Sequence, residues 1–358
     1  MENRLLNLGF SDRFIQEAAL YPELHLGRVV AQYKDLYKVA TSKSEILAEI
    51  SGKLRHSSGE LSDYPAVGDF VMLDREDGQH GNAIIHNILT RKSVFARKAA
   101  GTANDVQVVA ANIDTVFICM SLNNDFNLRR LERYLAIAWD SGATPVIVLT
   151  KSDLCEDLPQ RLSEIEKSAA GVDVLITSSL IQDGCKDVLK YIAPGRTAAF
   201  MGSSGVGKST LINRIIGEDI AETKEIRKDD KGRHTTTRRE LIVIPAGGAV
   251  IDTPGMRELG VESVDLSKTF TDIDDIAAGC RFSDCRHEKE PGCAVRKAIE
   301  EGLIDEERLA SYKKLQKEAK YDGLNSRQIE KEKIDDMFSE FGGIKNARDF
   351  VKSKNKYR

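Results

Sequence analysis

Eight consecutive residues in the second half of the chain could bind the phosphates of a nucleotide. The run Gly202–Ser209 fits the pattern G-x-x-x-x-G-K-[ST], whose glycines let backbone N–H groups approach phosphate oxygens. Lys208 would neutralise the β- and γ-phosphates and so act in catalysis, and Ser209 would ligate Mg²⁺. The residues predicted to contact the nucleotide here are Gly202, Ser203, Ser204, Gly205, Val206, Gly207, Lys208, Ser209 and Thr210.

This chemistry requires the loop to join a strand to a helix, and the flanking residues fit that requirement. The apolar run 197–201 predicts the strand, and Leu211, Ile212 and Ile215 share one face of a predicted helix over 210–216. The start of that helix would add a favourable dipole for an anion. A Gly/Ser linker before a helix is the alternative, and the ordered Lys208-Ser209 pair argues against it.

Selection of the base is predicted for the segment Thr150-Lys151-Ser152-Asp153, which follows the apolar run 145–149. A carboxylate at Asp153 can accept hydrogen bonds from the ring N–H and the exocyclic amine of guanine, and adenine offers no such donor pair. Lys151 can lay its stem along the base. The segment resembles the N/T-K-x-D motif of GTPases, with Thr150 where Asn is commoner. If Asp153 were an unrelated turn residue, the site would serve an ATPase.

Two further segments favour the same ligand. Ser178 and Ser179 follow a strand-like run and resemble the short loop whose backbone contacts guanine in GTPases. In the segment Asp252-Thr253-Pro254-Gly255, Asp252 would hold Mg²⁺ and Gly255 would sense the γ-phosphate. The motifs together indicate GTP or GDP with Mg²⁺.

The motifs occur in a permuted order, because the base motif precedes the phosphate loop. A sheet tolerates such a permutation if the original termini lie close together. As a result, the segment after Gly255 leads directly into the C-terminal region, whose position the γ-phosphate could therefore bias.

Hydrolysis is predicted to depend on the segment 232–237, which has the position of switch I. We expect Thr236 to complete the Mg²⁺ shell and His234 to orient the attacking water, which makes both candidate catalytic residues. Met256 stands where Ras-like enzymes carry the water-orienting Gln, so slow intrinsic hydrolysis and stimulation by a partner are expected. Arg233 and His234 could instead only contact that partner.

The residues Cys280, Cys285, His287 and Cys293 form the pattern C-x4-C-x-H-x5-C. Three thiolates and one imidazole at this spacing suit tetrahedral Zn²⁺. Four protein ligands leave no open position for a catalytic water, so one structural Zn²⁺ is predicted. Coincidental clustering of reduced cysteines is the alternative.

Composition limits the kind of protein. The chain has 358 residues, 41% hydrophobic residues and a net charge of −4, which is typical of a globular protein of two or three domains. Near-neutral charge does not itself indicate nucleic acid. No apolar run approaches about 18 residues, and residues 1–24 lack the core of a signal peptide, so neither a membrane span nor secretion is expected. The protein is predicted to be cytoplasmic and monomeric.

Three regions differ in pattern and predict a multidomain α/β protein. Residues 1–104 contain short β-like runs that predict a small β-barrel, and residues 105–264 alternate strands and helices as a parallel α/β sheet does. Residues 265–358 are polar and helical, contain the Cys/His cluster and end in a basic tail.

This combination resembles the ribosome small-subunit-dependent GTPase A family (RsgA, also called YjeQ), over nearly the whole chain. The resemblance rests on the motif order T-K-x-D, S-S, G-S-S-G-V-G-K-S, G-R-H-T-T-T, D-T-P-G and C-x4-C-x-H-x5-C, and on the segment 97–101. It implies an OB-fold, a circularly permuted GTPase domain and a zinc-binding C-terminal domain. It also implies late maturation of the small (30S) ribosomal subunit, with that particle stimulating GTP hydrolysis.

Binding to rRNA would then involve the barrel and the basic tail. Candidate barrel residues are Tyr33, Lys34, Tyr37, Lys38, Lys53, Arg55, Arg91 and Lys92. Ordinary core and solvated surface is the alternative for these residues. Two other functions are alternatives: a permuted GTPase of large-subunit assembly, and a non-hydrolysing nucleotide-bound RNA-binding scaffold. The barrel and the Cys/His cluster argue against the first, and intact Lys208, Ser209 and Asp252 argue against the second.

Overall fold

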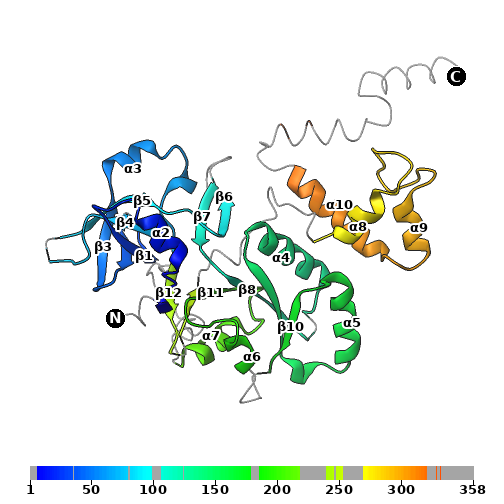
Figure 1. Cartoon of the computed structure of the whole chain (residues 1–358). Coiled ribbons are helices and arrows are strands. Elements are labelled where there is room, and N and C mark those ends of the chain that lie inside the picture. The colour runs from blue at the N-terminus through cyan, green and yellow to red at the C-terminus, as the bar shows by residue number, and fades with distance from the viewer. Residues whose placement is uncertain are drawn as a thin grey trace, which may run out of the picture.

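The computed structural model of the chain places its helices and strands in a barrel, a central α/β part and a C-terminal helical part (Figure 1). The residues that it describes are 6–34, 36–79, 81–98, 106–123, 125–178, 185–217, 239–245, 247–252 and 269–320, together with Gln328 and Lys331. The predicted boundaries at 104 and 264 lie outside these ranges, so they stay predictions. Among the described residues, no helix combines the length and apolar character that crossing a membrane would require.

The N-terminal part is a closed five-strand barrel, as predicted. Its order is β1-β2-β3-β5-β4, and β1 also pairs with β4, which closes the sheet. A core forms inside from alternate residues such as Val29, Val39 and Ile85, and helix α2 stacks Phe14 on Phe70 with ring centroids 3.8 Å apart. The elements are α2 (Asp12–Ala18), β1 (His25–Gln32), β2 (Tyr37–Ala40), β3 (Glu45–Ile50), α3 (Gly52–Ser57), η1 (Leu61–Asp63), β4 (Phe70–Leu73) and β5 (Ala83–Ile88).

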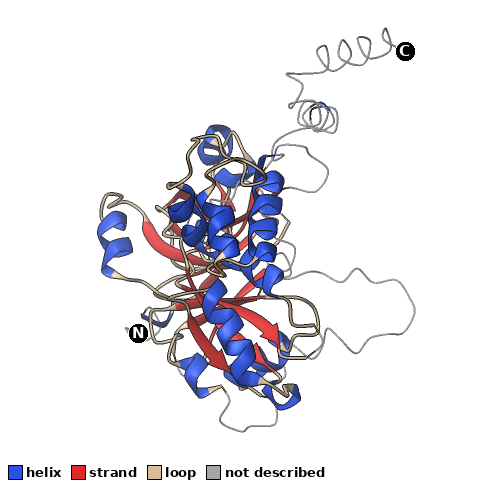
Figure 2. Cartoon of the chain, turned by 90° about the vertical axis from the view of Figure 1, so that its right-hand side faces the viewer, coloured by secondary structure: helices blue, strands red, loops and turns tan. Residues whose placement is uncertain are grey.

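The central part is built on a sheet with helices on both faces (Figure 2). The strands β10-β9-β8-β11-β13 are parallel, and every residue of β8 is buried, as expected for a strand covered on both sides. Helices α4 and α5 pack on one face through Leu131 and Ile165, and α6 and α7 pack on the other through Val188 and Leu211. The strands are β8 (Thr115–Ser121), β9 (Thr144–Thr150), β10 (Asp173–Ile176), β11 (Thr197–Met201), β12 (Arg239–Val243) and β13 (Ala249–Asp252). The helices are α4 (Leu128–Asp140), η2 (Ser152–Leu154), α5 (Leu158–Ser168), α6 (Lys186–Leu189) and α7 (Lys208–Ile216).

One sheet runs through the barrel and the central part. Strand β12 pairs with β13 on one side and with β1 of the barrel on the other, both antiparallel. The register places Ala31 opposite Glu240 and Gln32 opposite Arg239. A separate two-strand sheet, β6 (Val94–Lys98) with β7 (Val106–Ala111), lies where the chain passes from the barrel to the central part. The shared sheet was not predicted from the sequence.

The C-terminal part consists of α8 (Thr271–Ala277), α9 (Ala294–Glu300) and α10 (Glu306–Lys320), and it packs against α4 through α10 (Figure 1). The main polar contact is a buried one. Arg308 on α10 donates to Glu132 on α4 at 2.9 Å and to Asp272 on α8 at 2.7 Å. Arg308 and Glu132 are 6% and 0% exposed, so this ion pair is shielded from water and its geometry is strongly constrained.

Candidate nucleotide site and metal centre

The phosphate loop lies between β11 and α7, in the predicted strand–loop–helix context. The backbone at Gly202 passes so close to Cys119 that only glycine fits, because a Cβ there would lie 2.5 Å from the carbonyl oxygen of Cys119. Gly205 and Gly207 have φ values of 78° and 97°, in the left-handed region that favours glycine. The glycines therefore set the shape of the loop. The loop leads into the N-terminus of α7, where the helix dipole favours a bound anion.

Lys208 is folded back over this loop. Its Nζ donates to the carbonyl oxygens of Gly202 at 2.7 Å and Ser203 at 2.5 Å, and the residue is 5% exposed. The ammonium group is thus fixed at the loop, where it can neutralise bound phosphate. Ser209 and Thr210 follow it in the first turn of α7, at the end of the helix that faces the loop.

The base motif contacts the phosphate loop directly. Thr150, the last residue of β9, donates its hydroxyl to the carbonyl oxygen of Val206 at 2.5 Å. Lys151 has a left-handed φ of 56°, and its Nζ donates to the carbonyl oxygen of Gly205 at 2.8 Å. These contacts place the two motifs in one site. Thr150 therefore holds the base motif against the phosphate loop, although Asn is commoner at this position of the motif.

Asp153, the predicted base acceptor, is held by Ser178, whose hydroxyl donates to its carboxylate. Ser178 itself is buried at the end of the segment that follows β10. The backbone fixes this arrangement further, because Thr177 donates to the carbonyl oxygen of Leu149 at 2.7 Å. The structure therefore brings Ser178 to the base motif, and its contact with guanine stays a prediction.

A pocket opens between these segments and extends beyond the predicted residues. Its lining consists of Thr150, Lys151, Thr177, Ser178, Cys185, Gly207, Thr210, Leu211 and Arg214. Burial raises the pKa of Cys185, so its thiol is neutral there. Arg214 approaches the carbonyl oxygen of Ser178 at 3.5 Å and was missed, although its i, i+4 spacing from Thr210 on the predicted helix could have found it.

Asp252 ends β13, which is parallel to β11, so this residue lies at the same edge of the sheet as the phosphate loop. Ser179, Arg233, His234, Thr236, Gly255 and Met256 lie outside the described residues, and so does the basic tail, 345–358. The roles predicted for them stay predictions.

The predicted RNA-facing residues of the barrel divide into two groups. Tyr33, Lys34, Lys53 and Arg55 are exposed or partly exposed. By contrast, Tyr37 is buried, and Arg91 binds the buried carboxylate of Asp69 at 2.8 Å. Lys92 binds Asp114 at 2.6 Å. Lys38 pairs with Glu45 at 2.5 Å but keeps 40% of its side chain exposed, so its role at an RNA surface stays a prediction. The interpretation of Tyr37, Arg91 and Lys92 as an RNA surface is therefore corrected: they stabilise the fold.

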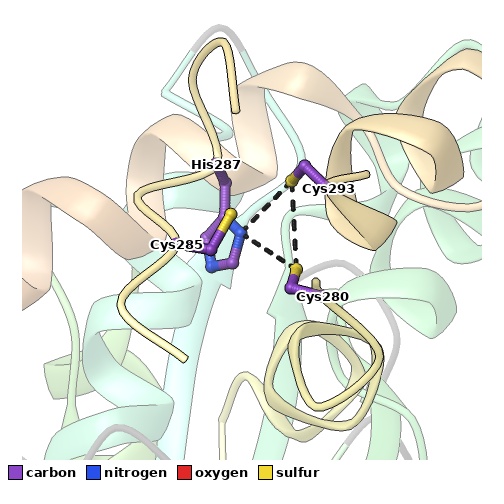
Figure 3. A group of neighbouring side chains, drawn as sticks. All are labelled: Cys280, Cys285, His287 and Cys293. Atoms are coloured by element: carbon purple, nitrogen blue, oxygen red, sulfur yellow. Dashed lines mark hydrogen bonds between the residues drawn. The ribbon is translucent and has the colours of Figure 1, made fainter. Parts of the chain in front are cut away.

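The Cys/His cluster has the dimensions of a zinc site (Figure 3). All four ligand atoms lie within 4.8 Å of one another. Nδ1 of His287 is 3.6 Å from Sγ of Cys280 and 3.5 Å from Sγ of Cys293, and those two sulfur atoms are 4.0 Å apart. Tetrahedral Zn²⁺ with ordinary bond lengths needs S···N edges of roughly 3.6 Å and S···S edges of roughly 3.8 Å. The residues therefore fit the ion.

Electrostatics favour the ligand form that a metal needs at two of the four residues of the cluster. Burial opposes ionisation of Cys280, but hydrogen bonds from the backbone of Val295 and Ala294 outweigh it and lower the pKa of the thiol. Burial and the nearby Lys313 ammonium lower the pKa of His287, which keeps the imidazole neutral. Zinc binds thiolate and neutral imidazole, so both of these shifts have the favourable sign. Cys285 is the exception, because burial and the neighbouring thiols of Cys293 and Cys280 raise its pKa to about 11, so binding of the metal must displace its proton.

A carboxylate outside the ligand set orders the loop that bears His287. The carboxylate of Glu290 accepts from the backbone N–H groups of Arg286, Glu288 and Lys289 at 2.9, 2.7 and 3.0 Å. These bonds lower the pKa of Glu290 to about 2. They also support the left-handed backbone of His287, whose φ is 57°.

Replacing Glu290 by Gln should weaken zinc binding by up to about tenfold, because an amide accepts these three bonds less well than a carboxylate does. Competition with a chromophoric chelator measures the affinity. Glu288→Gln is the matched control, since Glu288 faces Lys313 at 3.5 Å and holds none of these amides through its side chain. Equal affinities for the Glu290→Gln and wild-type proteins would contradict the role of the carboxylate.

A phosphate loop after β11, bonded to a base motif that comes earlier in the chain, defines a circularly permuted GTPase. Comparisons with known proteins agree. Residues 88–262 match the family model described as RsgA GTPase. The small ribosomal subunit biogenesis GTPase RsgA 2 of Lactiplantibacillus plantarum is 52% identical over 330 residues, which cover 92% of each chain. The RsgA of Methanosarcina acetivorans is 42% identical over 337 residues, covering 92% of this chain and 90% of that protein.

Two solved structures share the architecture. YjeQ from Thermotoga maritima superposes with a TM-score of 0.61 at 29% identity, covering 82% of this chain and 97% of that one. YloQ, described as a circularly permuted GTPase, gives a TM-score of 0.59 at 25% identity, covering 82% of this chain and 95% of that one. The chain belongs to the RsgA GTPase family and is a GTP hydrolase, and its predicted fold class is confirmed.

Proposed function

We propose that this protein hydrolyses GTP to GDP and phosphate during late maturation of the small ribosomal subunit, and that this particle stimulates the reaction. The observation that carries the proposal is the direct bonding of Thr150 and Lys151 to the phosphate loop, which makes one site for base and phosphates. The assignment to the small subunit is supported by the names of the relatives, which are small ribosomal subunit biogenesis GTPases.

The nucleotide contacts follow from this site. Asp153 would receive the guanine edge, with Lys151, Ser152 and the 178–179 segment around the base. The loop 202–207 with Lys208 and Thr210 would hold the phosphates. When bound, Mg²⁺ would neutralise charge on the β- and γ-phosphates, and Ser209, Thr236 and Asp252 are the residues proposed to hold it. His234 would orient the attacking water once the particle has organised the switch.

The Cys/His cluster would bind one structural Zn²⁺, with the four side chains of the cluster as its complete ligand set. Contact with rRNA is proposed for the exposed residues Tyr33, Lys34, Lys53 and Arg55 of the barrel, together with the basic tail. Location in the cytoplasm and a monomeric state complete the proposal.

The test is the rate of GTP hydrolysis with purified small subunits, with large subunits and without particles, at two salt concentrations. Small subunits alone should accelerate turnover, and less so at high salt, because contacts with RNA phosphates are screened. Acceleration by large subunits would indicate large-subunit assembly instead. Absence of turnover with every particle would indicate a nucleotide-bound scaffold.

Replacing Asp153 by Asn should change the preferred base. The amide loses the acceptor for the guanine amine but can donate to the corresponding carbonyl of xanthine. Affinity for GTP should fall on the order of 100-fold, and XTP should bind in its place. Competition of a labelled nucleotide by GTP, XTP and ATP measures the change, with Asp187→Asn in an exposed ion pair as control. Unchanged preference for GTP would remove Asp153 from base recognition.

A further inference from the structure

A carboxylate and a guanidinium from outside the nucleotide motifs hold one residue of the phosphate loop. The hydroxyl of Ser203 donates to the carboxylate of Asp125 at 3.0 Å and accepts from Arg130 at 2.9 Å. Arg130 also binds both carboxylate oxygens of Asp125, at 2.9 and 3.1 Å. The three side chains therefore form a closed ring of hydrogen bonds, in which every bond involves a charged group.

Ser203 also faces the other way, toward the nucleotide side of the loop. Its carbonyl oxygen accepts from Nζ of Lys208 at 2.5 Å. A single loop residue therefore joins the Asp125–Arg130 pair to the ammonium group that neutralises the phosphates. A shift of Ser203 would move one of the two carbonyl groups that position Lys208.

The Asp125–Arg130 pair is held in place by hydrogen bonds from residues close to it in the chain. Asn123 accepts from the backbone N–H of Asp125 at 3.1 Å and from the hydroxyl of Ser121 at 2.8 Å. Asn127 caps α4 by accepting from the backbone N–H of Arg130 at 2.9 Å. Because a two-pronged arginine–carboxylate pair is also rigid, the ring presents Ser203 with a fixed partner.

Helix α4, which carries Arg130, is held by the C-terminal part at Glu132 and Arg133. Glu132 is fully buried and accepts from Arg129 on the same helix at 2.6 Å and from Arg308 on α10 at 2.9 Å. Arg133 reaches Glu318 on α10 at 2.8 Å. The first two turns of α4 thus contact the phosphate loop on one side and α10 on the other.

We propose that Asp125 and Arg130 are positioning residues for GTP binding and hydrolysis, which set Lys208 through Ser203, and that α4 makes this setting depend on the docked C-terminal helices. The proposal concerns the intrinsic reaction and does not depend on which ribosomal particle stimulates it. The competing explanation is a partly exposed ion pair that contributes little beyond local stability.

The test is a double-mutant cycle on GTP affinity and on single-turnover hydrolysis without particles. Ser203→Ala and Arg130→Ala should each lower GTP affinity by about tenfold, and the double variant should lower it no further, because both remove the same ring. Asp125→Asn should lower it as well. Additive losses would overturn the proposal. So would opposite effects of Arg130→Ala and Asp125→Asn, which would indicate that only their charges act on the nucleotide.

A purely structural role has a different signature. It would lower the thermal unfolding midpoint of the Arg130→Ala protein and leave its GTP affinity unchanged, which would also overturn the proposal. Lys190→Ala is the control, since it removes an exposed ion pair at the end of α6, on the face of the sheet opposite α4. This variant should bind GTP as the wild type does.

The dependence on the C-terminal helices is tested with Arg308→Lys, which keeps the charge but cannot bind Glu132 and Asp272 in the same fork. GTP affinity should fall about threefold in the wild-type background and stay constant in the Arg130→Ala background. An equal fall in both backgrounds would show that α10 does not act through Arg130. The first cycle remains decisive even if Arg308→Lys fails to dock the C-terminal helices.

Discussion

Replacement of Lys208 by Met should lower the single-turnover rate of GTP hydrolysis by about 10³-fold while leaving the fold intact. Removing a preorganised positive group from the place where charge develops costs transition-state stabilisation of this order. Met retains much of the aliphatic stem, so packing around the nearly buried side chain is largely kept. The rate and the GTP affinity can be measured on the same preparation, with and without ribosomal particles.

The Lys208→Met substitution should not lower the thermal stability of the nucleotide-free protein. Without nucleotide, Lys208 is a nearly buried cation that relies on the carbonyl groups of Gly202 and Ser203. Its removal lifts the cost of burying that charge, so the nucleotide-free unfolding midpoint should be unchanged or higher. Lys151→Met, at the lysine of the base motif that donates to the loop, is the control and should affect the chemical step less. A Lys208→Met protein with near-normal turnover would refute the assignment.

Removal of zinc should unfold the C-terminal helices and detach them from α4, while the barrel and the central sheet remain folded. Helices α8 and α9 have seven residues each, too few to be stable alone in water. The cluster joins the end of α8 to the start of α9, because Cys280 follows the first and Cys293 caps the second. In comparable small sites metal binding contributes about 10–16 kcal/mol to folding.

Circular dichroism and hydrogen exchange of residues 269–320 before and after chelation would measure this loss. Cys293→Ser should reproduce it without chelator, because Cys293 is the buried ligand. Cys155→Ser, at a half-buried thiol outside the cluster, should keep both metal and protection. Full protection of α9 and α10 in zinc-free protein would contradict a structural role for the ion.

The features predicted correctly from the sequence are local ones. The phosphate loop is eight consecutive residues, and the Cys/His cluster spans fourteen, so their chemistry is fixed by spacing along the chain. The barrel was also predicted from short β-like runs, although such runs do not give the ends of a strand such as β1, His25–Gln32. This is because pairing with neighbouring strands, and not the run itself, decides where a strand ends.

The features that were missed depend on residues distant in sequence. Arg91 was assigned to an RNA surface because it is basic, but Asp69 binds it in the interior of the fold. The ring at Ser203 joins the start of α4 to a loop more than seventy positions away, and no periodic pattern in the sequence predicts such a contact. The β1–β12 pairing joins residues 31–32 to residues 239–240, a separation that periodicity along the chain cannot encode.

That pairing has a mechanical consequence. Strand β12 is the first described element after the segment predicted as switch I, and backbone hydrogen bonds tie it to the barrel. A rotation of the barrel relative to the central sheet would have to break those hydrogen bonds. We therefore expect the two parts to move together as one rigid body. Force applied to the barrel by a large partner would reach β12 directly through these backbone hydrogen bonds. The C-terminal helices are held through side chains, and they could detach while the shared sheet stays whole.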